Sequence, residues 1–130
     1  MDKKRILVID DSPSVTALLK LKLEDTGLYE VREENDGARS LDSAREFSPD
    51  LIVLDIVMPN MDGGDVEAQL RDDPQLQRTP VVFLTCAVKK DEVGQAGGMM
   101  IRGRLFIPKP IDMRFVLRSV EEYLSIPDSR

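Results

Sequence analysis

Short runs of apolar residues recur along the chain and predict four buried strands. They lie at residues 6–9, 51–54, 81–84 and 105–107, and each is rich in branched side chains and bounded by polar residues, proline or glycine. A continuous apolar run of this length is typical of a strand that is buried on both faces, as in a parallel sheet. Residues 29–32 alternate between apolar and polar side chains instead, which predicts an edge strand with one side exposed to solvent.

Amphipathic helices are predicted between these strands, because apolar residues return at intervals of three or four. Their start and stop signals place them between Ser12 and Gly27, before Pro49, between Asp62 and Pro74, and between Asp112 and Pro127. Residues 89–104 contain four glycines, which weaken a helix, so we predict only a short or irregular fourth helix there.

Five strands alternating with helices predict an α/β fold with a doubly wound, five-stranded parallel sheet. If the alternating second strand is an edge, the strand order is 2-1-3-4-5, and ligands then bind beyond the carboxyl ends of strands 1 and 3. The length of 130 residues predicts a single domain, 1–130, with no effector domain.

Composition excludes several classes of function. No apolar run approaches the ~20 residues that cross a bilayer, so we expect no membrane partner and a cytoplasmic location. The net charge is −6 and no dense basic stripe is present, which argues against direct nucleic-acid binding. The chain contains no histidine and one cysteine, Cys86, which removes histidine-based nucleophile pairs, histidine metal ligands and an intrachain disulfide.

Polar residues follow the central strands at the positions where each strand is predicted to end. They are Asp10 and Asp11, Asp55, Thr85 and Lys109. Each has an ordinary alternative when taken alone: an acid before Ser12 can cap a helix, and Asp55 can be a solvated strand end. Because the carboxyl ends of parallel strands meet at one edge of a sheet, we expect the five side chains to converge.

Such a cluster predicts phosphoryl chemistry. Three carboxylates repel one another unless a cation or protons intervene, and oxygen-only ligands select a hard ion such as Mg²⁺. A lysine at the same place adds a positive charge suited to phosphate. Asp55 is then the carboxylate best placed to act as a nucleophile and form an acyl phosphate.

The motifs V-I-D-D-S, V-L-D-I-V-M-P-N-M-D-G, F-L-T and I-P-K-P, in this order, resemble the receiver domain of two-component response regulators. The resemblance implies a flavodoxin-like fold in which Asp10, Asp11, Asp55 and the backbone carbonyl of Val57 hold Mg²⁺. It further implies that Asp55 accepts a phosphoryl group from the histidine of a kinase or phosphotransfer protein.

The same resemblance assigns further roles. It implies that Thr85 and Lys109 bind the phosphoryl oxygens and that the Lys109–Pro110 bond is cis. Thr85 and Phe106 are then the switch residues, although a phenylalanine in that strand is equally explained by core packing. The downstream protein target is not identified, and a phosphorylation-dependent homodimer is left open.

Some residues depart from the family pattern. Cys86 follows Thr85 where a smaller residue is usual, and an inert buried thiol is the simpler interpretation. Val57 and Ala87 are apolar at positions that influence how water reaches the acyl phosphate, which predicts a long-lived phosphorylated state. The glycine-rich residues 95–100 replace part of the usual output surface, and Met99 and Met100 there suit either a contact patch or core packing.

Three other functions compete with a phosphorylation-switched signalling module. A Mg²⁺-dependent phosphohydrolase with an aspartate nucleophile would carry a second Asp where this chain has Val57. A flavodoxin-like cofactor protein would not place Asp10 and Asp11 in the loop that must receive phosphates. A structural domain that has lost its switch would not be expected to keep Asp11, Asp55, Thr85 and Lys109. We therefore expect a phosphoacceptor module and not an enzyme that turns over free substrates.

Overall fold

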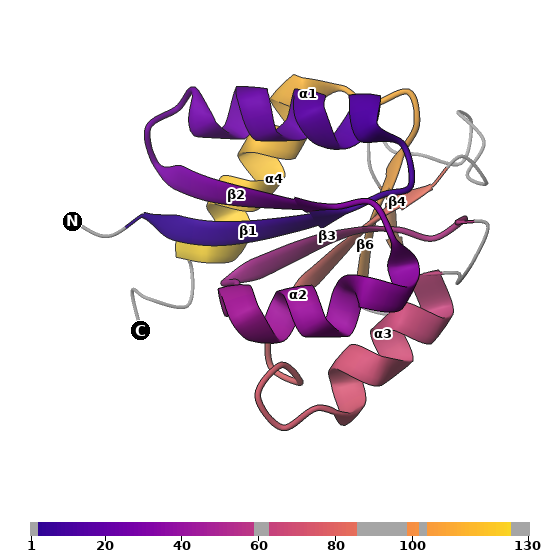
Figure 1. The fold of residues 1–130 in the computed structure, drawn as a ribbon. Coiled ribbons are helices and arrows are strands. Elements are labelled where there is room, and N and C mark those ends of the chain that lie inside the picture. Colours follow the sequence, from indigo (N-terminus) through magenta and orange to yellow (C-terminus); the bar gives the residue numbers. More distant parts are fainter. Residues whose placement is uncertain (1–2, 59–62, 86–98, 102–103, 126–130) are drawn as a thin grey trace.

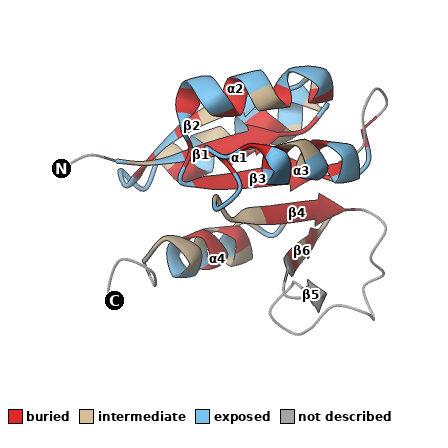
Figure 2. Ribbon diagram, turned by 90° about the horizontal axis from the view of Figure 1, so that it is seen from below, coloured by how far each residue is buried: buried red, intermediate tan, exposed pale blue. Residues whose placement is uncertain are grey.

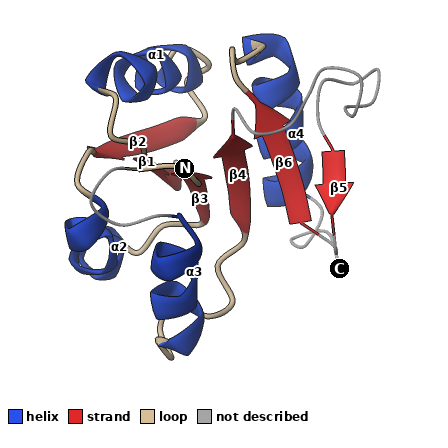
Figure 3. Ribbon diagram, turned by 90° about the vertical axis from the view of Figure 1, so that its right-hand side faces the viewer, coloured by secondary structure: helices blue, strands red, loops and turns tan. Residues whose placement is uncertain are grey.

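Six strands form one sheet in the computed structural model, which describes residues 3–58, 63–85, 99–101 and 104–125. The strands are β1 (Lys4–Ile9), β2 (Tyr29–Glu34), β3 (Leu51–Asp55), β4 (Val81–Thr85), β5 (Met99–Ile101) and β6 (Arg104–Pro108). Their order across the sheet is β2-β1-β3-β4-β6-β5. All neighbours run parallel except β5, which is antiparallel to β6 (Figure 3).

The predicted fold class is confirmed, with β6 as the fifth parallel strand of the 2-1-3-4-5 order. The prediction for residues 89–104 is wrong where the structure describes them, because residues 99–101 form β5 and not part of a helix. The glycines of this region disfavour a helix, and antiparallel pairing of Met99 with Phe106 gives the backbone other hydrogen-bond partners. The remainder, 89–98 and 102–103, lies outside the described residues.

Helices cover both faces of the sheet. They are α1 (Pro13–Glu24), the short 3-10 helix η1 (Gly37–Arg39), α2 (Ser40–Phe47), α3 (Gly63–Asp72) and α4 (Met113–Ser125). In Figure 1, α1 and α4 lie on one side of the sheet, and α2 and α3 lie on the other. The predicted boundaries hold for α1, which has Pro13 in its first turn and is followed by Gly27 at φ 79°.

Alternate residues of the strands divide the core into two layers. Ile6 and Val8 pack with α1 and α4, whereas Leu7 and Ile9 pack with α2 and α3, and all four side chains are fully buried. Figure 2 shows the resulting pattern, with buried residues along the sheet and on the inner sides of the helices. Each fully buried Leu or Ile contributes roughly 1.5–3 kcal/mol relative to an exposed position. Burial on both faces therefore holds the strand ends in fixed positions.

No helix among residues 3–58, 63–85 and 104–125 combines the length and the apolar character that a membrane span requires.

Candidate functional site

An acidic cluster lies at the carboxyl edge of the sheet, where the neighbouring strands β1 and β3 end. Asp10 follows β1, Asp55 is the last residue of β3, and both are almost fully buried. Lys109 follows β6 and reaches both acids: its Nζ lies 2.8 Å from Asp10 Oδ2 and 3.5 Å from Asp55 Oδ2. The parallel sheet thus brings together three charged side chains that are far apart in the sequence.

Asp10 does not cap α1, which was one interpretation of its position. The N-cap residue is Ser12, and Asp10 Oδ1 accepts a hydrogen bond from the backbone N–H of Ser12 at 2.9 Å, ahead of the helix. Asp10 Oδ2 is buried, and the Lys109 ammonium at 2.8 Å is its ion-pair partner among the described residues. A buried carboxylate oxygen of this kind is costly unless it has a further cationic partner.

The carboxylates of Asp10, Asp11 and Asp55 fit a hard metal ion. Each offers one oxygen, and these oxygens lie within 4.8 Å of one another. Asp11 is exposed, so the cluster opens to solvent on its side. Mg²⁺ prefers oxygen ligands and keeps several waters alongside one or two carboxylates, which matches a partly open acidic cluster. In the described part of the chain, this is the one group of three or more acidic, histidine or cysteine residues close enough to hold an ion.

Burial and neighbouring charges give Asp55 an unusually high pKa for an aspartate. The pKa of Asp55 is raised from 3.8 to about 6, first by burial and then by the neighbouring Asp10 carboxylate, while Lys109 and the backbone N–H of Val57 oppose the shift. Burial alone would lower the pKa of Lys109, but its contacts with Asp10 and Asp55 outweigh that effect and raise the pKa. The lysine is therefore a permanent cation beside a carboxyl group that is costly to ionise without a second cation.

Thr85 and Phe106 lie on the neighbouring strands β4 and β6. Thr85 is buried at the end of β4, and its carbonyl accepts the backbone N–H of Lys109 at 3.0 Å. Phe106 is half-buried and stacks on Phe83, with ring centroids 4.9 Å apart and an angle of 17° between the rings. The ring therefore packs against the core in this conformation, and a switch role for Phe106 stays a prediction.

Val57 lies beside Asp55 in the loop after β3. Its backbone N–H donates to Asp55 Oδ1 at 3.3 Å, and its side chain is exposed. The role of its carbonyl as a metal ligand stays a prediction.

The Lys109–Pro110 bond is cis, as expected. Cys86, Ala87 and residues 89–98 lie outside the described residues, so the expectations for them are untested.

Two residues near the cluster were not singled out from the sequence. Gly63, the first residue of α3, lies so close to β3 that a Cβ atom on it would meet the Asp55 carbonyl oxygen and the Ile56 Cα at 2.6 Å each. Asn35, in the loop after β2, donates through Nδ2 to the Asp10 carbonyl at 2.7 Å. Gly63 follows Met61 and Asp62, and a glycine there is a weak indication that two backbone segments pack closely. No feature of the sequence indicated a role for Asn35.

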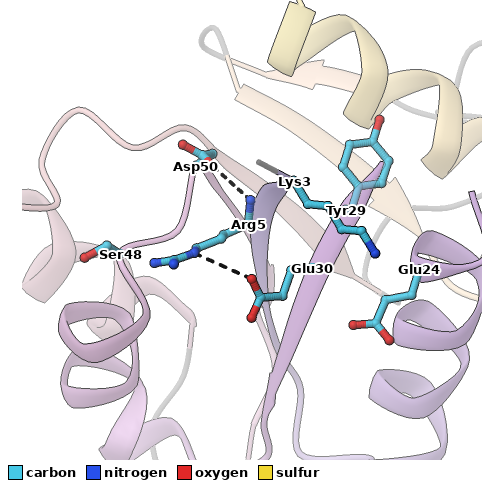
Figure 4. A pocket seen from close by; sticks show the side chains of 7 residues that line it. All are labelled: Lys3, Arg5, Glu24, Tyr29, Glu30, Ser48 and Asp50. Carbon is cyan, nitrogen blue, oxygen red and sulfur yellow. Dashed lines mark hydrogen bonds and ion pairs between the residues drawn. The ribbon is translucent and has the colours of Figure 1, made fainter. Parts of the chain in front are cut away.

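A separate hollow lies at the opposite, amino-terminal end of the strands, with a volume of about 880 Å³. Figure 4 shows that Arg5 lies between Asp50 and Glu30. The backbone N–H of Arg5 donates to Asp50 Oδ2 at 2.8 Å, and its Nε lies 3.7 Å from Glu30 Oε1. Among the described residues, the acids that line this hollow do not form a group of three close enough to hold an ion, unlike those of the carboxyl edge, where we place the candidate functional site.

Comparisons with known proteins identify the family of this chain. The model of the response regulator receiver domain family matches residues 6–121. The chain is 32% identical over 121 residues to protein PilH of Pseudomonas aeruginosa, covering 93% of this chain and 98% of PilH. It is 33% identical over 123 residues to the polar-differentiation response regulator DivK of Brucella anthropi, covering 93% of this chain and 96% of DivK.

Longer relatives and solved structures match as well. The chain is 37% identical over 121 residues to the alkaline phosphatase synthesis transcriptional regulatory protein PhoP of Bacillus subtilis, but spans only 48% of its length. The structure of the chemotaxis protein CheY4 of Vibrio cholerae superposes with a TM-score of 0.79 at 28% identity, covering 95% of this chain and 100% of CheY4. The family match over most of the chain, together with the acidic cluster and the sheet order, shows that this chain belongs to the response regulator receiver domain family.

Proposed function

We propose that Asp55 is the phosphoacceptor of a signalling switch and takes its phosphoryl group from a phosphohistidine on a partner kinase or phosphotransfer protein. The observation that carries the proposal is the pairing of the buried Asp55 carboxylate with Lys109 and with the second buried acid, Asp10. Membership of a signalling domain family supports a protein-based phosphoryl donor. The absence of histidine from this chain means that the donor imidazole must come from the partner.

The transfer is a displacement at phosphorus. An Oδ atom of Asp55 attacks the phosphorus, the new O–P bond forms, and the P–N bond of the phosphohistidine breaks. The imidazole nitrogen leaves with the bonding electron pair, and the product at Asp55 is an acyl phosphate. Asp55 must react as the carboxylate, and its pKa without a bound cation is raised to about 6, so a cation that favours the ionised form also favours transfer.

Positive charge at the site assists the transfer. Lys109 Nζ already lies 3.5 Å from Asp55 Oδ2 and is placed to contact an oxygen of the incoming phosphoryl group. Thr85, at the end of the adjacent strand, is proposed to bind another of these oxygens. When bound by Asp10, Asp11 and Asp55, and by the carbonyl of Val57, Mg²⁺ supplies the charge that neutralises the carboxylates and the phosphoryl group.

Phosphorylation is proposed to act on partners through protein contacts or through onward relay of the phosphoryl group. Thr85 and Phe106 are the proposed switch residues, since they lie on the neighbouring strands β4 and β6 that lead from the site. Action in the cytoplasm, the single-domain organisation, the lack of nucleic-acid binding and a phosphorylation-dependent homodimer all stay predictions.

The alternative, a phosphohydrolase acting on free phosphate esters, has less support. It would need a general acid two residues after Asp55, where the side chain is the apolar and exposed Val57. Family membership also favours a signalling domain over a typical enzyme. We propose that the domain promotes only its own phosphorylation and dephosphorylation.

The proposed function is tested by incubating the protein with acetyl phosphate and following its intact mass. We expect a gain of one phosphoryl group that depends on Mg²⁺ and disappears with a chelator. The isosteric variant Asp55→Asn should gain nothing, because an amide is not a nucleophile for this transfer. A phosphoryl group that still appears on Asp55→Asn would place the acceptor elsewhere and overturn the assignment.

The apolar Val57 predicts slow loss of the phosphoryl group. Its exposed side chain lies next to Asp55 and cannot orient a water molecule toward the acyl phosphate. We expect Val57→Asn to shorten the lifetime of the phosphorylated protein severalfold, measured by mass after removal of the donor. Val57→Ala is the control for simple loss of bulk. Slower decay in Val57→Asn than in the parent protein would contradict the prediction.

A further inference from the structure

We propose that Asn35 is a positioning residue for the metal-binding acids, and this inference rests on the proposed function of the cluster. Asn35 lies in the loop between β2 and η1, outside the acidic cluster. Its side-chain Nδ2 donates one hydrogen bond to the carbonyl of Asp10 at 2.7 Å and a second to Thr16 Oγ1 at 3.0 Å. One amide group thus joins the loop to the end of β1 and to α1.

The chemistry of the partners determines which atom of the amide makes these contacts. The Asp10 carbonyl can only accept a hydrogen bond, so the atom 2.7 Å from it must be the amide nitrogen and not the amide oxygen. Thr16 is fully buried, and its hydroxyl donates to the Pro13 carbonyl at 3.2 Å, which leaves its oxygen to accept from Asn35. The directions of the hydrogen bonds are therefore mutually consistent, and a carboxylate at position 35 could not reproduce them.

The hydrogen bond to Asp10 acts on the peptide group that joins the two metal-binding acids. The Asp10 carbonyl belongs to the Asp10–Asp11 peptide, and the other side of Asp10 is held by its N–H, which donates to the Glu34 carbonyl at 3.1 Å. Asp10 is buried, but Asp11 is exposed, so packing around its side chain does not fix its direction. Holding the shared peptide is the means by which Asn35 orients Asp11 relative to Asp10 and Asp55.

Asn35 is expected to favour metal binding because it orients the acids from outside the coordination sphere. Residues that orient metal ligands from outside the coordination sphere typically change metal affinity by about 10- to 100-fold when they are replaced. Asn35 is neutral, so it orients the acids without adding to the negative charge that already raises the pKa of Asp55. Loss of the amide leaves Asp10 held by Ser12 and Lys109 but frees Asp11 to adopt other orientations, which the metal must then reverse on binding.

The test is a direct measurement of Mg²⁺ affinity by isothermal titration calorimetry on the full chain. We expect Asn35→Ala to weaken Mg²⁺ binding about tenfold. Ala38→Gly is the matched control, because Ala38 is exposed in the adjacent turn and its replacement weakens the local structure without changing charge or touching Asp10. Its Mg²⁺ affinity should stay within about twofold of that of the parent protein.

A kinetic measurement separates positioning from general destabilisation. In the acetyl phosphate reaction, the Mg²⁺ concentration at half-maximal rate should rise with the dissociation constant in Asn35→Ala, while the rate at saturating Mg²⁺ stays close to that of the parent. Unchanged Mg²⁺ affinity in Asn35→Ala, or an equal loss in Ala38→Gly, would overturn the inference. Failure of the parent protein itself to bind Mg²⁺ would instead overturn the metal site of the proposed function, and the inference with it.

Discussion

In the absence of divalent cations, Asp55→Asn will stabilise the fold by about 2–3 kcal/mol at pH values well above 6. The reason is that the pKa of Asp55 is raised from 3.8 to about 6, first by burial and then by Asp10. The folded state therefore holds this proton more tightly than the unfolded state, and its stability falls as the pH rises through that interval. The amide of Asn is neutral at every pH and removes this cost.

The stability difference between the parent protein and Asp55→Asn should depend on pH. Below pH 3.8 the carboxyl group is protonated in both states, so the two proteins should differ little in their free energy of unfolding. The difference should develop between pH 3.8 and about 6 and then remain constant. Urea unfolding in a chelator at several pH values measures it, and saturating Mg²⁺ should reduce the difference by stabilising the parent protein.

Asp11→Asn is the matched control for this experiment. It removes one negative charge from the same cluster, but Asp11 is exposed, so little desolvation cost is relieved. Its stabilising effect should be clearly smaller than that of Asp55→Asn. Equal effects of the two substitutions would mean that total charge, and not the burial of Asp55, determines the cost.

Gly63→Ala will destabilise the fold by about 1–3 kcal/mol and will also slow phosphorylation of Asp55. An added Cβ would lie 2.6 Å from both the Asp55 carbonyl oxygen and the Ile56 Cα, which is closer than atoms of this kind can approach. Both neighbours are backbone atoms of the strand end, so no side-chain rotation relieves the contact. The backbone N–H of Gly63 also donates to the Ile56 carbonyl at 2.6 Å, and separation of the two segments would stretch this bond.

Gly64→Ala is the control for the helix itself. Gly64 is the next residue of α3 and is exposed, so alanine there should be neutral or should stabilise the helix by up to about 1 kcal/mol. Urea unfolding reports stability, and mass spectrometry with acetyl phosphate reports the reaction at Asp55. Parent-like stability of Gly63→Ala would show that α3 can move away from β3 at little cost.

The sequence determined the layered fold and the location of the site to a large extent. The apolar runs of β1, β3, β4 and β6 are short, rich in branched residues and bounded by polar residues, proline or glycine, which favours strands buried on both faces over helices. Parallel strands end at one edge, so the residues after them were expected to lie together. Asp10, Asp55 and Lys109 do lie together, while their catalytic roles stay predictions.

Tertiary contacts determine the features that the local sequence pattern does not predict. Strand β5 has three residues in a glycine-rich region, and only pairing with β6 defines it. The sequence does not distinguish Asp10 from Asp11, yet the fold buries the first and exposes the second. The pKa of Asp55, the hydrogen bond from Asn35 and the close approach of Gly63 likewise depend on segments that meet only in the folded chain. Hydrophobic periodicity records which face of an element is buried, whereas the charge, reach and clearance of single residues depend on neighbours that are distant in sequence.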